Sequence, residues 1–259
     1  MTDGRDGRSF SVPPCRRLTW DLLWFNRSVP LCGHDRVMSL APLAAARSSA
    51  SVRISWPALF LKAYSLAAQD IPELRQTWYR WPLAHLYQHP HSVGTLTVQR
   101  EVKGEPWLFW GLIDQPENLS LTEIQGQIDR WVQAPVREVF RRQQKLARLP
   151  TVLRRLIWRW NLHVAKAGRA SRLGTFFLST LSGRGVEIQV PPSIHTGCLT
   201  YGPLNEDGRT RVTLAYDHRI MDGARAAECL IRLEQLLLEK LSQELLQVCP
   251  QDAKIPHAA

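Results

Sequence analysis

The sequence predicts a mixed α/β protein that folds as one domain. Residues 211–217 alternate apolar side chains with small or polar ones, a pattern typical of a half-buried strand. From residue 226 to residue 237 the apolar side chains recur at helical spacing instead. With 259 residues, 44% of them hydrophobic and 22% charged, the chain can bury a substantial core. No internal repeat divides the sequence, so we expect a single large domain.

The other elements are predicted from the same periodicities and from punctuating residues. Helices are expected at residues 16–26, 56–69, 120–134 and 149–167, and strands at 36–40, 95–102 and 107–113. Ser120 and Glu123 form a capping box, Pro150 suits the first turn of a helix, and Gly168 suits a C-cap. The Ala- and Ser-rich run at residues 40–51 is predicted to be a loop.

Positive charge is concentrated in one segment. Residues 137–172 hold eleven Lys or Arg and one acid, Glu138, and so carry the whole net charge of +10. One helical stripe there is apolar and a second face is basic; the stripe comprises Leu149, Val152, Leu153, Leu156, Ile157, Trp160 and Val164, and the basic face comprises Arg148, Arg155 and Arg159. We expect the apolar stripe to pack on the domain and the arginines to be replaceable without unfolding.

We expect a flexible segment at residues 1–13, the folded domain at 14–247 with a basic helical insertion at about 136–172, and a tail at 248–259. The start of the chain lacks the apolar core of a secretory signal, and no uncharged apolar run reaches about 18 residues. These features predict a soluble, cytoplasmic protein. Its five scattered cysteines never form a CxxC motif and are expected to be reduced, structural thiols.

His218 is the strongest candidate for a chemical role. It follows the predicted strand at 211–217, stands four residues before Asp222, and is held by a turn at Gly223. Local backbone can fix an imidazole placed in this way, and a fixed imidazole serves as a general base near neutral pH. The alternative is a strand-end histidine satisfied by backbone groups.

The residues around His218 resemble the catalytic domain of dihydrolipoamide acyltransferases and the related chloramphenicol acetyltransferase. Residues 216–223, YDHRIMDG, are similar to the DHRxxDG signature of that family, and residues 174–181, GTFFLSTL, are similar to its GTFTISNL segment. The IPEL run at 71–74 before Trp78 resembles the hPELNxxW stretch, and the basic start of the helix at 16–26 resembles the first helix. The resemblance is colinear over residues 14–245. It implies a chloramphenicol acetyltransferase-like α/β sandwich, in which helices flank a mixed sheet.

The resemblance also implies roles for particular residues. His218 would be the general base and Ser179 would donate a hydrogen bond to the oxyanion of the tetrahedral intermediate. Asp222 would pair with an arginine and brace the histidine loop, with Arg16 as the best-placed match and Arg17 next. Gly223 would supply backbone freedom at the turn, and Asp217 would give structural support. In the family the serine and the histidine face each other across a subunit interface, so a homotrimer is implied.

A metal site is not expected. His85, His89 and His91 have a zinc-like spacing, but Pro90 and the lack of acid or cysteine partners favour a surface loop. His195 has no motif around it and is expected to be structural.

The function that these observations predict is a stand-alone acyltransferase. It would move an acyl group from a thioester donor, coenzyme A or an acyl carrier protein, to a small-molecule nucleophile, with the coenzyme A thioester as co-substrate and no bound cofactor. One alternative is a dihydrolipoamide acyltransferase core without a lipoyl domain, and another is a catalytically silent trimeric scaffold or lipid-binding module. For residues 148–166 a solvated face, carrier-protein docking and peripheral membrane contact stay open, whereas nucleic acid is disfavoured. Trp158 and Trp160 favour the membrane among these.

Overall fold

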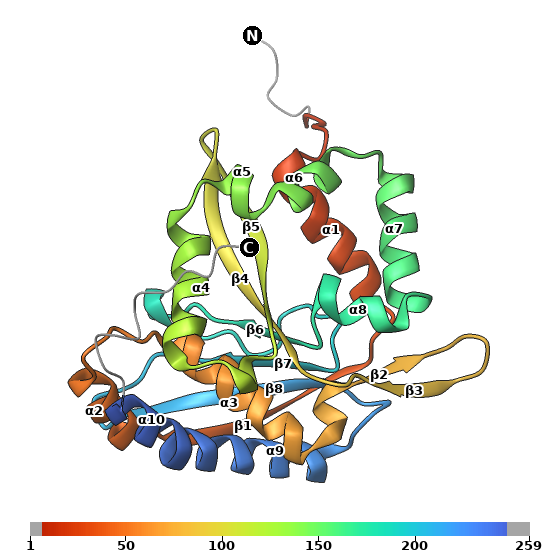
Figure 1. Cartoon of the computed structure of the whole chain (residues 1–259). Coiled ribbons are helices and arrows are strands. Elements are labelled where there is room, and N and C mark those ends of the chain that lie inside the picture. Colours follow the sequence, from red (N-terminus) through yellow and green to blue (C-terminus); the bar gives the residue numbers. More distant parts are fainter. Residues whose placement is uncertain (1–6, 248–259) are drawn as a thin grey trace.

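The computed structural model describes residues 7–247, and its centre is a six-stranded mixed sheet in the order β1-β8-β7-β6-β4-β5 (Figure 1). The strands are β1 (Leu31–Ser39), β4 (Val93–Val102), β5 (Glu105–Asp114), β6 (Phe176–Ser179), β7 (Gly197–Tyr201) and β8 (Arg209–Asp217), and a separate hairpin is formed by β2 (Gln76–Tyr79) and β3 (His85–Gln88). Strand β6 runs parallel to both of its neighbours, and the other pairs in the sheet are antiparallel. The predicted α/β class with a mixed sheet flanked by helices is confirmed.

Helices cover the sheet on both sides (Figure 1). They are α1 (Pro14–Asn26), α2 (Ala41–Ser49), α3 (Trp56–Asp70), α4 (Leu121–Gln133), α5 (Val136–Val139), α6 (Arg141–Arg148), α7 (Thr151–His163), α8 (Lys166–Leu173), α9 (Gly223–Leu236) and α10 (Ser242–Gln247). Helices α3 and α9 pack on each other and on one side of the sheet, whereas α1 and α8 contact the other side at β5. None of the described helices is long and apolar enough to span a bilayer.

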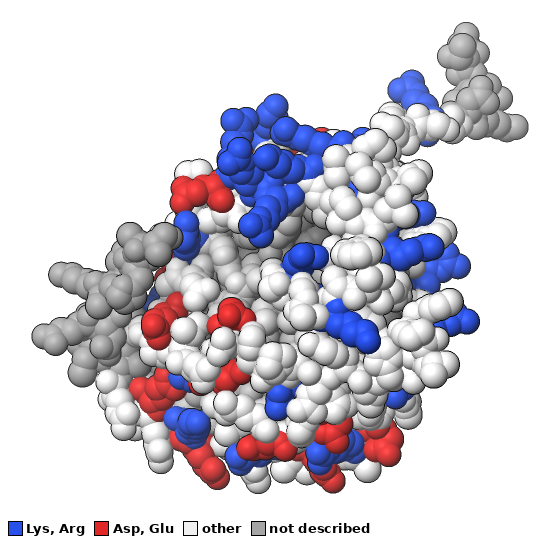
Figure 2. Space-filling model, turned by 45° about the vertical axis from the view of Figure 1, so that its right-hand side comes forward, with Lys and Arg blue, Asp and Glu red and all other residues white. Residues whose placement is uncertain are grey.

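Charge is unevenly distributed over the surface. Figure 2 shows Lys and Arg gathered over the upper part of the molecule, where Figure 1 places α5, α6 and α7. Acidic side chains lie mainly over the lower part in the same view. Between Glu138 and Glu187 the sequence contains no acidic residue at all, which explains why this region has no balancing charge.

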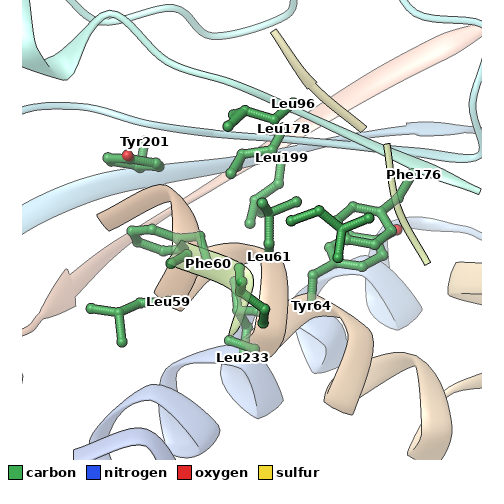
Figure 3. Packing of buried hydrophobic residues seen from close by; sticks show 14 of the residues in the cluster. Leu59, Phe60, Leu61, Tyr64, Leu96, Phe176, Leu178, Leu199, Tyr201 and Leu233 are labelled. Carbon is green, nitrogen blue, oxygen red and sulfur yellow. The ribbon is translucent and has the colours of Figure 1, made fainter. Parts of the chain in front are cut away.

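The main core lies between the sheet and α3. Every residue from Ala58 to Ala68 is buried, and all of them are apolar except Lys62, Tyr64 and Ser65. The Phe60 ring stacks on Tyr201 at 4.2 Å between centroids, and the Tyr64 ring stacks on Phe176 at 4.0 Å (Figure 3). These aromatic pairs join α3 to β7 and β6.

Helix α7 begins after Pro150 as predicted, but it ends at His163, short of Gly168, and it buries a different face from the predicted one. Its apolar stripe is exposed: Val152, Leu153, Leu156, Trp160 and Val164 are 73%, 45%, 56%, 58% and 51% exposed. The buried face contains Arg154 and Trp158 instead. Arg154 is 1% exposed because Asp21 of α1, itself fully buried, accepts from its Nε at 2.6 Å. This ion pair selects the buried face over the purely apolar one.

Two local predictions are also wrong. Residues 41–49 form helix α2, not a loop, because Ala is the best helix former and this helix buries Leu43 and Ala46. Gly168 is not a C-cap, since it lies inside α8. Gly174 ends that helix, with φ of 88° and with Thr95 so close that a Cβ would have no room.

The cysteines Cys15, Cys32, Cys198 and Cys229 are free thiols, as predicted. Cys249 and the proposed tail at residues 248–259 lie outside the described residues.

Candidate active site

His218 lies directly after the last residue of β8. Its backbone N–H donates to the Pro30 carbonyl at 3.1 Å, and its ring lies 5.7 Å from the Tyr216 ring. The side chain is exposed. The strand end and the Pro30 contact therefore hold the backbone of His218 while its imidazole stays accessible to another molecule.

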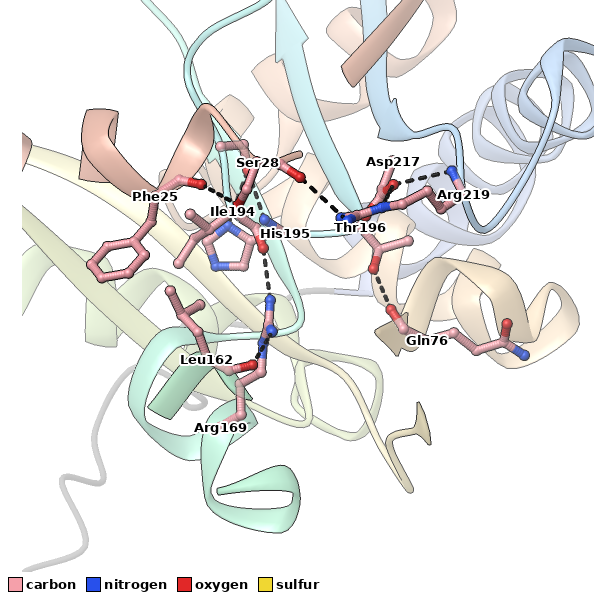
Figure 4. Close-up of polar contacts among 11 residues, drawn as sticks. Phe25, Ser28, Gln76, Leu162, Arg169, Ile194, His195, Thr196, Asp217 and Arg219 are labelled. Atoms are coloured by element: carbon pink, nitrogen blue, oxygen red, sulfur yellow. Dashed lines mark hydrogen bonds and ion pairs between the residues drawn. The ribbon is translucent and has the colours of Figure 1, made fainter. Parts of the chain in front are cut away.

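Asp217 and Arg219, the two neighbours of His218, bind each other and so stabilise the loop (Figure 4). Asp217 is 4% exposed, and its carboxylate accepts from the Arg219 side chain at 2.8 Å and 2.5 Å. Arg219 also donates to the Ser28 carbonyl at 3.2 Å, and its guanidinium carbon lies 4.1 Å from the centre of the Trp78 ring. Two charge-assisted bonds and a cation–π contact thus fix the chain on both sides of the histidine.

Asp222 is the N-cap of α9. Its carboxylate accepts from the backbone N–H of Arg225 at 3.1 Å, which satisfies one of the free donors of the first helical turn. It makes no ion pair with Arg16 among the described residues. Arg16 is exposed at the start of α1, and Figure 1 shows the starts of α1 and α9 at opposite ends of the molecule. Arg17 donates to the carbonyls of Val12 and Ala147 instead.

Arg225 provides the ion pair that ties this helix start to the domain. Its guanidinium donates to both carboxylate oxygens of Glu73 at 3.0 Å, and to Glu228 at 2.6 Å. These acceptors raise the pKa of Arg225, and hydrogen bonds from Arg225 lower the pKa of Glu73 although partial burial opposes the shift. Sequence reasoning found Glu73 and Trp78 only as parts of a motif. Their contacts with Arg225 and Arg219 join that motif to the histidine loop.

Gly223 provides space and not backbone freedom. Its φ is not in the left-handed region, so the reason predicted from the sequence is wrong. A Cβ at this position would lie 2.9 Å from Nε2 of His34, which projects from the neighbouring strand β1. A larger residue at this position would therefore require the His34 ring to move.

Ser179 is the last residue of β6, half-buried and far from His218 of the same chain. It pairs with Thr200 in β7, and Thr200 pairs with Thr213 in β8. His218 lies five residues beyond Thr213, so the two side chains are separated by roughly 20 Å, at about 3.3 Å per residue and 4.8 Å per strand. One chain does not bring this serine and this histidine to the same substrate atom.

The three histidines at 85–91 do not share one surface loop, since His85 belongs to the β2–β3 hairpin and the other two follow it. His85 lies in β3, and His89 is 1% exposed with its Nε2 3.1 Å from the Thr77 hydroxyl. Burial, followed by the charge of Arg169, lowers the pKa of His89 to about 4. Within residues 7–247 no group of three or more His, Cys, Asp or Glu could hold a metal ion.

No protein-family model and no curated protein sequence matches this chain. Solved structures match it in fold. A truncated catalytic core of the 2-oxoacid dehydrogenase multienzyme complex from Thermoplasma acidophilum gives a TM-score of 0.66 at 15% identity, covering 90% of this chain and 99% of that chain. A probable dihydrolipoamide acetyltransferase from Listeria monocytogenes gives 0.62 at 15% identity, covering 98% of both chains.

A third similar structure, the dihydrolipoamide acetyltransferase of Azotobacter vinelandii, gives a TM-score of 0.62 at 19% identity and covers 92% of this chain and 94% of that chain. It was solved to investigate the roles of a serine, a histidine and an asparagine in the catalytic mechanism of that enzyme. At these identities the likeness concerns the fold. This chain has the fold of the catalytic cores of dihydrolipoamide acetyltransferases.

Proposed function

We propose that the protein is an acyltransferase that moves an acyl group from a thioester donor to a small nucleophilic acceptor. The observation that carries the proposal is His218: an exposed imidazole at a strand end, braced on both sides, in the fold of acetyltransferase cores. A histidine used only for packing would be buried or hydrogen-bonded through its ring. The donor is proposed to be a coenzyme A thioester, and no bound cofactor takes part.

In the proposed reaction the unprotonated imidazole of His218 removes the proton of the acceptor as its heteroatom attacks the thioester carbonyl. A new bond joins the acceptor to the acyl carbon, and the negative charge collects on the carbonyl oxygen. The intermediate collapses by breaking the carbon–sulfur bond, and the thiolate takes the proton back from His218. Because the acceptor attacks directly, no acyl group is attached to the protein.

Ser179 is proposed to donate a hydrogen bond from its hydroxyl group to the oxyanion of the intermediate that forms at His218 of a neighbouring subunit. The separation of roughly 20 Å along the sheet leaves it outside the reach of His218 in its own chain. A site made of His218 from one chain and Ser179 from another fits both this separation and the homotrimer implied by the sequence. Asp222 and Gly223 have positioning roles, at the N-cap and at the contact with His34.

The test of catalysis is the rate of thiol release and product formation with short- and long-chain acyl-coenzyme A donors. We expect His218→Ala to lower turnover by about 10² to 10⁴ with an unchanged melting temperature. Ser179→Ala should lower turnover by about 10² to 10³ with little change in the Michaelis constant, since its bond forms chiefly in the transition state. Ser182→Ala, a neighbouring serine outside the site, is the matched control. Turnover of His218→Ala within about threefold of the wild type would refute the mechanism.

We also propose that α7 contacts an anionic membrane surface. Arginines border the exposed stripe: Arg159 is exposed, and Arg155, which is 3.7 Å from the buried carboxylate of Asp21, also lies 3.9 Å from the ring centre of Trp24 in α1. Apolar and aromatic side chains that insert at the lipid interface, surrounded by cations without acids, are typical of peripheral membrane helices.

This contact is tested by co-sedimentation with phosphatidylglycerol and phosphatidylcholine vesicles. We expect binding to the anionic vesicles only, and we expect Leu156→Ser with Trp160→Ser to abolish it. Leu246→Ser, an exposed leucine of α10, is the control. If the double variant changes the oligomeric state instead, the stripe belongs to a subunit interface. Binding to acyl carrier protein without binding to vesicles would replace the membrane by that carrier.

A further inference from the structure

Arg169 of α8 is a buried cation with no carboxylate within 4 Å among the described residues; the Tyr79 ring lies 5.8 Å away, and Asp217 acts on it only at longer range. Arg169 is 6% exposed, and its guanidinium donates to the carbonyls of Leu162 at 3.0 Å and Ile194 at 2.7 Å (Figure 4). Carbonyl groups satisfy N–H donors, but they do not neutralise the charge. A buried charge without an opposite charge is unfavourable for the folded protein.

The other buried charges in residues 7–247 are all paired. Arg154 forms a salt bridge with Asp21, Lys62 forms one with Glu244, and Asp217 forms one with Arg219. Arg169 alone among these side chains has no carboxylate within 4 Å in the described part of the chain. The exception therefore points to a missing anion.

Arg169 lines a cavity of about 810 Å³. Three further arginines, Arg80, Arg159 and Arg219, line the same cavity, and its one acidic residue is Asp217, which Arg219 already neutralises at 2.5 Å. The lining carries three more positive than negative charges. Walls of low polarity strengthen such a field, which attracts anions.

Most of the remaining lining is apolar and aromatic, with Ser28, Thr77, His163 and Thr196 as further polar residues. Trp24 and Phe25 come from α1, Trp78 comes from β2, and Leu162 and Ile194 complete the walls beside Arg169. A volume of this size falls in the range of small-molecule sites, which are lined mainly by apolar groups with a few fixed polar ones. The cavity suits a molecule with an apolar body and one anionic group.

Two parts of the sequence build this cavity together. Arg159, Leu162 and Arg169 belong to the basic insertion, whereas Asp217 and Arg219 flank His218 in the loop after β8. The insertion thus closes over the same loop that carries the proposed base. A ligand held by Arg169 would be anchored beside that loop.

We propose that this cavity binds a small molecule with an apolar body and a carboxylate or phosphate monoester, whose anionic group is the counter-ion of Arg169. The assignment of this molecule as the acyl acceptor rests on the proposed function, whereas the binding of an anion at Arg169 is independent of that function. A planar guanidinium with two N–H groups fixed by carbonyls still has donors for a carboxylate or phosphate oxygen.

The test compares charged and neutral probes by isothermal titration calorimetry. The probes are naphthalene-2-carboxylate, 2-naphthyl phosphate and neutral naphthalene-2-carboxamide, which share one apolar body. We expect the wild type to bind an anionic probe at least about tenfold more tightly than the amide, because the amide leaves the charge of Arg169 unpaired. The stronger of the two anions identifies the class of the natural ligand. Equal affinity for all three would overturn the proposal without any variant.

The variant Arg169→Met removes the charge and keeps a similar volume. We expect it to lose the tenfold preference, whereas Arg148→Met, which changes an exposed arginine outside the cavity, should keep it. Retention of the preference in Arg169→Met would overturn the role of Arg169. Competitive displacement of the probe by coenzyme A would overturn the assignment to the acceptor and place the donor there. If the probe binds but no acyl transfer is found with any donor, the anion site stands and the proposed function fails.

Discussion

At the residue scale, the histidine loop depends on pairs that come from distant parts of the sequence. The motif residues were recognisable, because Asp217, His218 and Gly223 lie in one short run. Their partners were not. Glu73 contacts Arg225 across 152 positions, and no local pattern indicates which of the 33 Lys and Arg residues a given acid will meet. The arginine implied by resemblance, Arg16, is on the wrong side of the molecule for Asp222.

The close approach of His34 to Gly223 predicts how an alanine at position 223 changes the stability of the protein. Replacing an unstrained helical Gly by Ala ordinarily stabilises a protein by about 0.4 to 1 kcal/mol. Here we expect Gly223→Ala to bring no gain and to cost less than about 1 kcal/mol, because the His34 ring must turn away from the new Cβ. In a His34→Ala background the same change should become stabilising. Urea denaturation of the four proteins measures the coupling, and additive effects would rule out the clash.

The buried histidine His195 predicts an acid-labile fold. Its Nε2 lies 2.6 Å from the Leu173 carbonyl and its Nδ1 lies 3.1 Å from the Ser193 hydroxyl, so the neutral ring is satisfied. Burial, and then the charge of Arg169, lowers the pKa of His195 from 6.5 to about 4. The unfolded chain binds this proton near pH 6.5 and the folded chain only near pH 4. The stabilisation is therefore complete above pH 6.5 and is lost as the pH falls from 6.5 to 4.

We expect this loss to reach about 3 kcal/mol for His195. Urea denaturation at pH 7, 6, 5 and 4 measures it, and His195→Gln should lose less stability over that range by about this amount. Parallel curves for the two proteins would show that His195 does not titrate as described. His91→Gln, at a more exposed histidine of the hairpin, is the control.

At the scale of elements, local signals sufficed where packing agreed with them. The helix at 56–69, the two strands around residue 104 and the capping box of Ser120 and Glu123 all form as predicted. Helix α2 was missed because its Ala-rich sequence shows no apolar stripe. Helix α7 was predicted with the wrong face buried, because Asp21, which is 133 positions from Arg154, decides which face is buried. Periodicity identifies the apolar face of a helix, but here the ion pair of Arg154 with Asp21 decides which face is buried.

The Asp21–Arg154 pair should hold α7 and α1 together. Both side chains are almost fully buried, so removing one partner leaves the other charge without compensation. We expect Asp21→Asn to destabilise the protein by about 3 to 5 kcal/mol. The exposed pair Arg130 and Glu138 is a matched control, and Glu138→Gln should cost less than about 1 kcal/mol.

The same comparison tests the orientation of the helix. Leu153→Ser should leave the midpoint of urea denaturation nearly unchanged, because this leucine faces solvent. A large loss for Leu153→Ser together with a small one for Asp21→Asn would mean that α7 buries its apolar stripe after all.

At the scale of the whole molecule, the separation of Ser179 from His218 predicts complementation between inactive variants. If each site takes its histidine from one chain and its serine from the next, random mixed trimers of His218→Ala and Ser179→Ala regain about a quarter of the intact sites. Co-refolding the two variants and measuring turnover gives the result. Mixing them after assembly is the control and should give no activity. A co-refolded mixture as inactive as its components would show that the site is not shared in this way.

Two early elements of the chain, α1 and β1, contact residues that are synthesised much later. Leu22 and Phe25 of α1 form a cluster with Trp158, Leu162 and Ile194. Strand β1 pairs only with β8 in the described sheet. During synthesis Leu22 and Phe25 therefore lack their cluster partners until residues beyond 150 have left the ribosome, although β5 can cover another part of α1 earlier. Strand β1 gains its one described sheet partner only when β8 has been made, so the nascent chain must keep β1 unpaired without aggregating until then.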